Sequence, residues 1–413
     1  MGKQVNIQGI RAFITDPKLG QGGQGLAQKA KLYSNSAIEL VIKSQAKTGK
    51  NDIRARKLVE LNLPSHSPYL AGPIAWTEKS GQIVHVAPFA KGRDVESDRP
   101  RSFPELVELC HHITCQWCVL EEKGIAHGDI APSNVIVSDD GSASLIDFDN
   151  FASLDAKVPK ATMAGQSMMT APEIRLRSHP PTIESDRFAY AVLFNMILLR
   201  RHPSDGMAAN PKELAKVMTT GHWPERVRPI QTGETPIEAM GDILPTLFDA
   251  AFDIDPKSRP TAQQWRHKFS QSLKAIYIHN CGHAFISGKK QSRCPFCQGY
   301  IQTPNQASSN ETMIFKVRIP SLGTKYSFGL KDGQSIYLGR NNLGRGAASV
   351  SNRHLSVSRL DQKLYLRHLG QHPSALYRDG QWYNLKDAWL KPHEYQKDGV
   401  LIRLANLDIH LGL

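Results

Sequence analysis

No long hydrophobic run is present in this sequence. The longest mostly apolar stretch, Ala189–Leu199, has about half of the roughly 20 residues that a membrane-spanning helix requires, so we interpret it as a buried core helix. The opening residues from Met1 carry no apolar segment followed by a cleavage site, which argues against secretion. Together these absences predict a cytoplasmic protein without a membrane partner.

Cysteine is also scarce, with six among 413 residues. In a reducing compartment these thiols stay free, so they are better interpreted as metal ligands or core residues than as disulfides. Cys110, Cys115 and Cys118 fall on one expected helix together with His111 and His112, and we interpret the three cysteines as small buried side chains. The other three cysteines occupy one short segment further along the chain.

The charge balance and length bound the class of protein. A formal net charge of +13 favours an anionic partner such as a nucleotide or an acidic protein. Because the basic residues are scattered, as on a solvated surface, we do not expect nucleic-acid binding. With 40% hydrophobic and 22% charged residues over 413 positions, the chain can bury ordinary cores in two or three domains.

The order of predicted elements divides the chain into five parts. Short strands predict a β-rich lobe over about 1–90, and helical spacing predicts a larger lobe over about 91–275. A compact Cys/His segment follows over 276–302, then a polar linker over 303–311. Alternating apolar residues between Gly, Asp and Asn turns predict an all-β sandwich over 312–413. The expected fold class is therefore multidomain α+β.

Four motifs in the first half meet the needs of phosphate transfer from ATP. The glycine loop Gly20-Gln21-Gly22-Gly23-Gln24-Gly25 offers backbone N–H groups to phosphates, and Lys43 at the end of an apolar strand supplies a cation. His127-Gly128-Asp129 followed by Asn134, and then Asp147-Phe148-Asp149, supply oxygen ligands for Mg²⁺ and a carboxylate for the incoming hydroxyl. A dinucleotide site is disfavoured, because it needs a helix opening directly at the glycines.

Over about residues 10–275 the chain resembles the eukaryotic-type (Hanks-like) protein kinase superfamily in its bacterial Ser/Thr form. The resemblance implies a bilobal fold, with Asp129 as the catalytic base and Lys43 on the α and β phosphates. It also implies that Asn134 and Asp147 hold Mg²⁺ or Mn²⁺. The implied ATP-binding residues are Leu19, Gly20, Gly22, Gly25, Val41, Lys43, Phe89, Ala90, Asp94 and Ile136.

Downstream residues favour a protein kinase over a kinase of small molecules. Ala171-Pro172-Glu173 stands where the resemblance ends the activation segment, and Arg259 stands where an arginine pairs with Glu173. Ser185-Asp186 begins the helix expected to anchor the catalytic loop. Ser167 or Thr170 is expected to touch Asp129, which favours Ser/Thr specificity.

Several positions depart from the pattern of the superfamily. Gly128 stands in place of an arginine that pairs with a phosphorylated segment, Ala131 in place of a lysine, and Asp149 in place of a glycine. The helix after Lys43 offers only Glu60, a turn late, as its carboxylate partner, and Arg54 or Arg56 occupies the expected position. Two alternatives therefore stay open: a pseudokinase adaptor, and a small-molecule kinase of the aminoglycoside or choline kinase type.

The Cys/His segment predicts a structural zinc site. Cys281-Gly282-His283 and Cys294-Pro295-Phe296-Cys297 provide three thiolates and one imidazole in two short-spaced pairs, the set that tetrahedral Zn²⁺ prefers. We expect Cys281, His283, Cys294 and Cys297 to be the ligands of a small zinc ribbon that needs the metal to fold.

The last hundred residues resemble a forkhead-associated (FHA) domain. The resemblance rests on Tyr337-Leu338-Gly339-Arg340 and on Ser351-Asn352-Arg353-His354, followed by short strands. It implies that Arg340 and Ser351 contact a phosphothreonine while His354 braces the loop, chemistry that suits a guanidinium and a hydroxyl. The peptide-gripping asparagine of that family has no evident counterpart. The expected partners are protein substrates and, through this module, a phosphothreonine-containing protein or an autophosphorylated segment.

Overall fold

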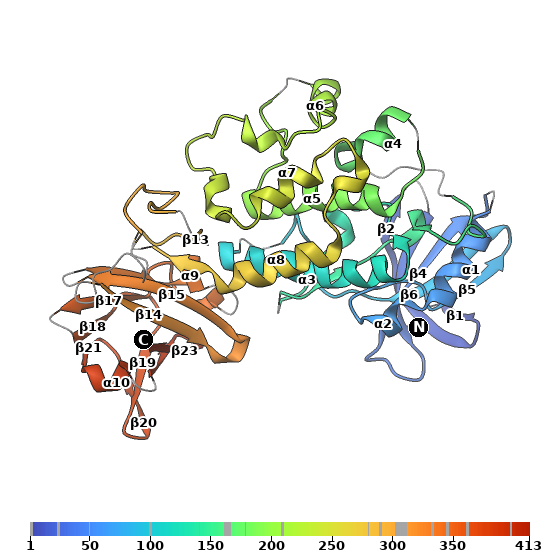
Figure 1. Cartoon of the computed structure of the whole chain (residues 1–413). Coiled ribbons are helices and arrows are strands. Elements are labelled where there is room, and N and C mark those ends of the chain that lie inside the picture. Colours follow the sequence, from blue (N-terminus) through green and yellow to red (C-terminus); the bar gives the residue numbers. More distant parts are fainter. Residues whose placement is uncertain are drawn as a thin grey trace.

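The computed structural model describes most of the chain. The described residues are 3–22, 25–48, 50–98, 101–139, 141–160, 167–177, 179–207, 210–279, 281–288, 291–301, 312–331, 334–343, 347–360, 363–396 and 399–413. Figure 1 shows a β-rich lobe at the N-terminus, a helical lobe in the centre and a β module at the C-terminus. No helix among these residues is long and apolar enough to span a bilayer.

The N-terminal lobe is a six-stranded sheet with the order β1-β2-β3-β4-β6-β5. Its inward face carries small and branched apolar side chains, including Ala30, Leu40 and Ile42, which form a hydrophobic cluster of their own. The strands are β1 (Gln4–Ile7), β2 (Ile10–Gly22), β3 (Gly25–Leu32), β4 (Glu39–Ala46), β5 (Ala75–Lys79) and β6 (Gln82–Pro88). Because β4 is an inner strand, Lys43 starts from the rigid part of the sheet.

One helix expected in this lobe divides into two. Helix α1 (Asn51–Leu61) ends at Asn62, whose φ of 43° lies in the left-handed region, and α2 (Leu63–His66) begins at once with Pro64 in its first turn. Proline is well placed at a helix start, where its missing N–H costs nothing. The helical segment that follows Lys43 is therefore two helices, divided at Asn62.

The central lobe is built around two long helices. Helix α3 (Phe103–Glu122) and helix α5 (Ile183–Leu199) each begin with a capping box. The other helices are α4 (Pro172–Arg177), α6 (Pro211–Val217), α7 (Pro245–Ala251) and α8 (Ala262–Lys274). Short strands lie beside the segments that carry Asp129 and Asp147: β7 (Arg93–Asp94), β8 (Ile125–Ala126), β9 (Val135–Val137), β10 (Ala143–Leu145) and β11 (Ala152–Ser153).

Aromatic side chains fill the core between these helices. Trp117 of α3 stacks on Tyr190 of α5 with ring centroids 4.1 Å apart, and Phe194 packs against Trp265 and Phe269 of α8. Such offset and edge-on pairs add to the free energy gained by burial. The apolar stretch predicted as a core helix is thus buried, and Cys110 and Cys118 lie in the same core.

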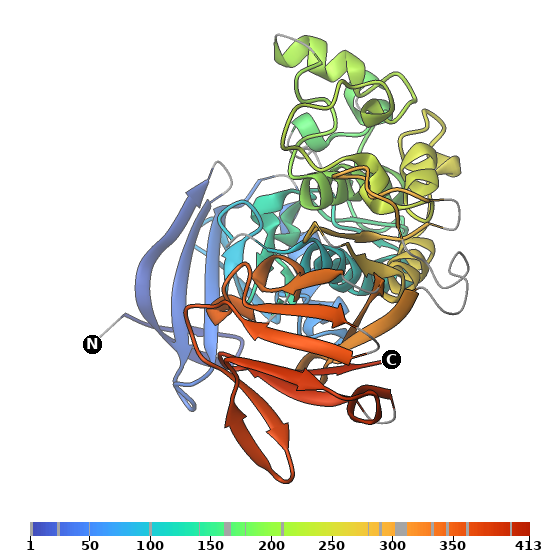
Figure 2. The same ribbon diagram turned by 90° about the vertical axis from the view of Figure 1, so that its left-hand side faces the viewer.

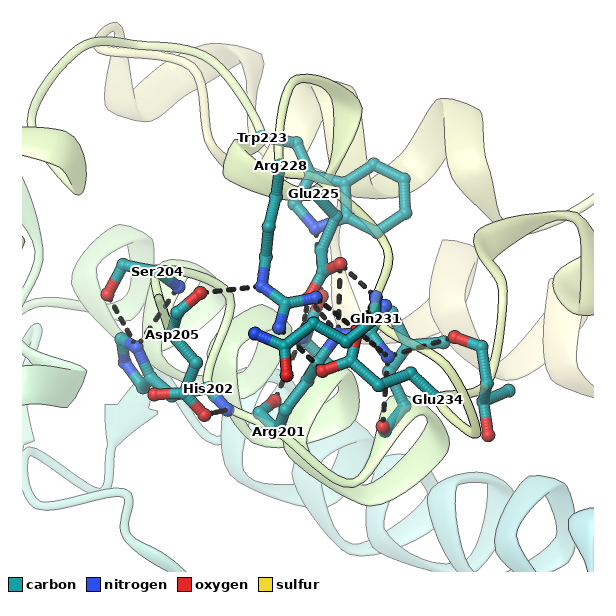
Figure 3. A network of polar contacts seen from close by, with 12 residues as sticks. Arg201, His202, Ser204, Asp205, Trp223, Glu225, Arg228, Gln231 and Glu234 are labelled. Atoms are coloured by element: carbon teal, nitrogen blue, oxygen red, sulfur yellow. Dashed lines mark hydrogen bonds and ion pairs between the residues drawn. The ribbon is translucent and has the colours of Figure 1, made fainter. Parts of the chain in front are cut away.

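A polar network connects the chain just after α5 to the segment that carries Trp223 and Glu225 (Figure 3). Arg201 and Glu225 form a buried ion pair with Nη2 to Oε2 at 2.7 Å. The Trp223 indole N–H donates to Asn195 Oδ1 at 2.9 Å, and Asn195 in turn donates to the Arg201 carbonyl. His202 lies beside this network and donates from Nε2 to the Met168 carbonyl at 3.1 Å. The network therefore reaches the segment that precedes Ala171.

The C-terminal region is all-β, with two sheets around one hydrophobic core. An eight-stranded sheet has the order β13-β12-β15-β14-β23-β22-β19-β20, and a four-stranded sheet has the order β16-β17-β18-β21. The strands are β12 (Ile276–Ile278), β13 (Ala284–Ile286), β14 (Thr312–Ile319), β15 (Thr324–Lys331), β16 (Ser335–Leu338), β17 (Leu355–Leu360), β18 (Lys363–His368), β19 (Ser374–Arg378), β20 (Gln381–Asn384), β21 (Asp387–Leu390), β22 (Val400–Leu404) and β23 (Leu407–Gly412). Two short helices, α9 (Arg340–Leu343) and α10 (Pro392–Gln396), complete the region.

The Cys/His segment joins the two larger bodies. Its hairpin of β12 and β13 extends the C-terminal sheet, because β12 pairs with β15 in parallel at Tyr277 and Ser327. Ile286 of the same hairpin belongs to the core of the central lobe. Figures 1 and 2 show β19 and β20 projecting from the opposite end of the C-terminal region. The expected linker over 303–311 lies outside the described residues.

A predicted ion pair stabilises the central lobe. Arg259 donates from Nη1 and Nη2 to the two carboxylate oxygens of Glu173, both at 2.8 Å, and its side chain is fully buried. The expected partnership of these two residues is therefore confirmed.

Removing one partner of a buried pair strands the other charge. We expect Arg259→Ala to lower the free energy of unfolding by about 3 kcal/mol or more, measured by chemical denaturation. The matched control is Arg226→Ala, which breaks a pair with Asp249 that is 43% and 44% exposed; it should cost about 1 kcal/mol or less. Equal losses in the two variants would contradict this account.

Candidate active site

A cavity of about 580 Å³ lies between the two lobes of the N-terminal two thirds. Its walls come from the β-rich lobe, from the connection after β6 and from the loops around β9 and β10. The lining residues are Leu19, Gly25, Ala27, Val41, Lys43, Ala71, Pro73, His85, Ala87, Pro88, Phe89, Ala90, Asp129, Ile136, Ile146, Asp147, Phe148 and Asp149.

Most residues expected at the nucleotide line this cavity, but Asp94 and Asn134 are not among its lining residues. Asp94 sits in β7 and accepts a hydrogen bond from the Ser97 N–H at 2.8 Å. Asn134 lies behind Asp129, as described below. Gly20 and Gly22 belong to β2, opposite Ala27 and Gly25 of β3, and the loop tip at residues 23 and 24 lies outside the described residues.

Gly25 is required where it stands. A Cβ atom there would lie 2.1 Å from the Ser44 carbonyl oxygen. The glycine thus lets β3 approach the strand that carries Lys43, and it brings the end of the glycine loop close to the lysine. Leu19, Val41 and Ile136 line the apolar part of the same cavity.

Lys43 contacts two carboxylates at the inner end of the cavity. Its Nζ lies 2.7 Å from Asp147 Oδ1 and 2.6 Å from Asp149 Oδ2. Burial by itself lowers the pKa of Lys43, but the charges of Asp149 and Asp147 outweigh it and the net pKa is raised. Lys43 therefore carries its positive charge inside the cleft, and the charge of Lys43 in turn holds the pKa of Asp147 low against its burial.

Asp186 of α5 holds the loop that carries Asp129. Its carboxylate accepts hydrogen bonds from the backbone N–H groups of His127 at 2.5 Å and Gly128 at 3.1 Å. Burial raises the pKa of Asp186 to about 7, and these two N–H donors act in the opposite direction. The buried His127 ring donates from Nε2 to the Ile146 carbonyl at 2.9 Å. These contacts fix the loops that carry Asp129 and Asp147 relative to one another.

Asn134 and Asn150 support Asp129 from two sides. The Asn134 side chain donates to the Asp129 carbonyl oxygen at 2.8 Å, and Asn150 donates to the Asp129 carboxylate at 3.3 Å. With its amide nitrogen engaged, Asn134 keeps Oδ1 as an oxygen ligand, and no hydrogen bond to this atom is found in the described part of the chain. Asn134 Oδ1 and the Asp147 carboxylate are hard oxygen donors that suit Mg²⁺.

The helix that follows Lys43 presents arginine to the site. Arg54 of α1 is 8% exposed and donates to the carbonyl oxygens of Asp149 at 2.9 Å, Phe151 at 2.5 Å and Pro159 at 2.8 Å. Glu60, the only glutamate of the helix, makes no ion pair to Lys43 in the described structure. The lysine is instead paired by Asp149, a role that the sequence alone did not indicate.

Four sulfur and nitrogen ligands meet in the segment after α8. His279, Cys281, Cys294 and Cys297 each offer one ligand atom, and these atoms lie within 4.8 Å of one another. His283, expected from the sequence as the fourth ligand, is not in this group. It lies exposed, with Nδ1 3.5 Å from Cys281 Sγ, and its ring stacks on Phe296 at 4.3 Å.

The hairpin geometry explains the exchange of histidines. His279 and His283 stand on opposite sides of one turn, where the His279 N–H donates to the His283 carbonyl. His279 Nδ1 faces Cys297 Sγ at 3.4 Å, while its Nε2 reaches the Tyr300 carbonyl at 3.3 Å. Since each histidine is two residues from Cys281, spacing alone does not choose between them. The Cys281 and Cys294 sulfur atoms lie 3.7 Å apart, and this contact lowers the pKa of Cys294 while it raises the pKa of Cys281.

The three residues expected at a phosphothreonine lie together in the C-terminal region. The Arg340 N–H donates to the Ser351 carbonyl at 3.0 Å, and the Ser351 N–H donates to Nδ1 of the buried His354. Arg340 is exposed and its Nε donates to the Val350 carbonyl. Ser351 Oγ accepts from the Gln371 N–H at 3.0 Å. The three side chains thus form one braced loop.

Comparison with known proteins agrees with the geometry of the cleft. A family model described as "Protein kinase domain" matches residues 13–269. Since this is more than half of the chain, the protein belongs to the protein kinase domain family.

Individual relatives are distant. The receptor-like serine/threonine/tyrosine-protein kinase SOBIR1 of Arabidopsis thaliana is 28% identical over 36% of this chain and 24% of its own length. The probable serine/threonine-protein kinase PknB of Lactococcus lactis is 27% identical over 28% and 18%. Serine/threonine-protein kinase PLK4 of Xenopus laevis is 26% identical over 45% and 21%. The chain thus spans a quarter or less of each of these three proteins.

Proposed function

We propose that this protein is a cytoplasmic, ATP-dependent Ser/Thr protein kinase of the Hanks type. The observation that carries the proposal is the convergence of Lys43, Asp129 and Asp147 on one cavity between two lobes. These groups come from β4, from the loop after β8 and from the loop after β10.

Each group has a defined task in phosphate transfer. Asp129 accepts the proton of the substrate hydroxyl or orients it, while Lys43 binds the α and β phosphates of ATP. Asn134 and Asp147 would hold Mg²⁺, which would supply positive charge to offset the charge on the transferred group. Leu19, Val41 and Ile136 provide the apolar walls for the adenine ring.

Specificity for Ser and Thr is supported by Thr170. This residue lines a small depression together with Asp129 and Gly128, directly before Ala171-Pro172-Glu173. A hydroxyl residue at this place beside the catalytic aspartate is typical of Ser/Thr kinases. The protein substrates are then expected to lie against the segment from Met169 to Ala171.

The direct test is phosphate transfer by the purified full chain. With labelled ATP and Mg²⁺ or Mn²⁺ we expect self-labelling on Ser or Thr, located by mass spectrometry. Asp129→Asn and Asp147→Asn should each reduce the rate at least about 100-fold. Asp139→Asn, in the exposed turn between β9 and β10, is the control and should leave the rate unchanged. Equal labelling by all four proteins would refute the assigned roles.

Two other outcomes correspond to the alternative functions. Binding of ATP without transfer to any protein would identify an adaptor. Transfer only to small hydroxyl compounds in a substrate screen would identify a small-molecule kinase. The Glu173–Arg259 pair disfavours this outcome.

We also propose that residues 276–302 form a zinc ribbon, with His279, Cys281, Cys294 and Cys297 as ligands. The set of three thiols and one imidazole fits tetrahedral Zn²⁺. The Tyr300 carbonyl orients His279 from its other nitrogen, as outer partners of metal-bound histidines do. Because the hairpin packs on both neighbouring bodies, the ion would fix the position of the C-terminal region on the central lobe.

The choice of histidine provides the test. We expect the purified protein to hold one zinc per chain by elemental analysis, His279→Ser to lower this content and the apparent Tm, and His283→Ser to change neither. A loss of zinc in the His283 variant alone would restore the ligand set expected from the sequence. A parent protein without any bound metal would contradict the site.

The C-terminal region over 312–413 is, in our proposal, an FHA-like module that binds phosphothreonine. The support is the braced loop of Arg340, Ser351 and His354, which presents a guanidinium and a hydroxyl at the surface. Such a module would dock substrates, partners or the protein's own phosphorylated segment near the kinase domain.

A binding measurement tests this module. We expect the parent protein to bind a mixture of phosphothreonine peptides and Arg340→Ala to weaken binding at least about tenfold. Arg367→Ala, which removes an exposed arginine from the neighbouring strand β18, is the control and should bind as the parent does. An unchanged affinity in the Arg340 variant would place the site elsewhere.

A further inference from the structure

The carboxylates that pair with Lys43 come from the segment after β10 and not from helix α1. Asp149 is the more deeply buried of the two carboxylates on Lys43, with a side chain 7% exposed against 36% for Asp147. Its second oxygen lies 4.0 Å from Nε2 of the buried His85 on β6. Asp149 therefore faces the sheet, while Asp147 faces the open part of the cavity. The two carboxylates are suited to different tasks, one to the lysine and one to a metal ion.

Arg54 holds the backbone that carries Asp149. Its guanidinium donates to the carbonyl oxygens of Asp149, Phe151 and Pro159, and it lies 4.7 Å from the Phe151 ring centroid. Three hydrogen bonds from one planar group fix both ends of this stretch against helix α1. Helix α1 and Lys43 are thus both connected to the segment that carries Asp149. The helix supplies the guanidinium of Arg54, and the segment supplies the carboxylate that pairs with Lys43.

Gly128 lets the same segment rest directly on the catalytic loop. It has φ of +76°, and a Cβ atom at this position would lie 2.1 Å from the Asn150 carbonyl oxygen. A side chain there would displace the Asn150 backbone, and with it the hydrogen bond from Asn150 to the Asp129 carboxylate. The antiparallel pair of strands β8 and β11 begins next to this contact. Since position 128 carries no arginine, it offers no side chain that could pair with a phosphorylated residue of the segment.

From these contacts we propose that Asp149 and Arg54 are positioning residues that hold Lys43 and Asp147 in their working places without phosphorylation of the segment. Asp149 supplies the carboxylate that the helix lacks, and Arg54 fixes the backbone of Asp149. Gly128 and Asn150 then lock the same stretch onto Asp129. This inference rests on the proposed kinase function, but the contacts themselves also predict how the protein binds nucleotide.

Nucleotide binding without turnover gives the first readout. We expect Asp149→Asn, which keeps the shape and removes the charge, to weaken the affinity for a fluorescent non-hydrolysable ATP analogue by roughly 10-fold or more. The matched control is Asp155→Asn, because Asp155 is an acidic residue of the same segment and pairs with Lys57 of the same helix at 3.2 Å. Affinity in the Asp149 variant equal to that in the Asp155 variant would overturn the proposal.

The kinetic split separates a lysine partner from a metal ligand. If Asp149 is a partner of the lysine, Asp149→Asn should lower kcat by a larger factor than it raises KM for ATP. Neither excess Mg²⁺ nor excess Mn²⁺ should then restore the rate. Recovery of the parent rate at high metal concentration would assign Asp149 to the metal instead, and would overturn the proposal.

The role of Arg54 needs a variant that folds. Arg54→Lys keeps one positive charge but cannot donate to three carbonyl groups, and we expect it to reproduce the loss of affinity seen in Asp149→Asn while its thermal unfolding stays close to the parent's. Parent-like affinity in a folded Arg54→Lys protein would contradict its role.

Phosphorylation independence is tested on the parent protein. After phosphatase treatment, verified by intact mass, the initial rate should equal that of the untreated protein. A drop of tenfold or more would overturn this part of the proposal. If the parent transfers no phosphate at all, the proposed function fails, while the affinity measurements still decide whether Asp149 and Arg54 order the site.

Discussion

The buried ion pairs of Lys43 are the interaction on which the cleft depends. A lysine so enclosed keeps its charge only because Asp147 and Asp149 lie within 2.7 Å of its Nζ. Burial of a charge without a partner is costly, so the sheet that carries Lys43 and the loop that carries the two aspartates must close together. The cavity between the two lobes follows from this constraint, because the same closure forms its walls.

The rest of the protein holds these groups in register. Asp186 fixes the loop that carries Asp129 through two backbone N–H groups, and the Glu173–Arg259 pair fixes the start of helix α4. Beyond α8, the hairpin of β12 and β13 shares side chains with the central lobe and strands with the C-terminal sheet. The Cys/His cluster lies on this hairpin, at the junction of the two bodies, where a bound metal ion would act on the orientation of both.

The sequence predicted most of the fold and the groups that carry the chemistry, and it missed the groups that hold them. Asp129, Asn134 and Asp147 are recognised because their spacing is local: Asp129 and Asp147 each follow a short strand, and Asn134 directly precedes one. The partner of Lys43 is 106 positions away, and its identity depends on which side of the segment faces the sheet. In the sequence, Gly128 indicates only that an arginine is missing. The structure shows that a side chain at this position would collide with the Asn150 carbonyl oxygen. His279 and His283 are equally spaced from Cys281, so only the turn between them decides which one joins the cluster.

A structure of the protein with Mg²⁺ and a non-hydrolysable ATP analogue tests the central claim most directly. The account predicts Lys43 Nζ between the α and β phosphates and the Asp149 carboxylate, with Arg54 still bound to the Asp149 carbonyl and the metal ion on Asp147 and Asn134. A structure in which Asp149 ligates the metal ion, or in which Lys43 turns to a carboxylate of helix α1, would contradict it.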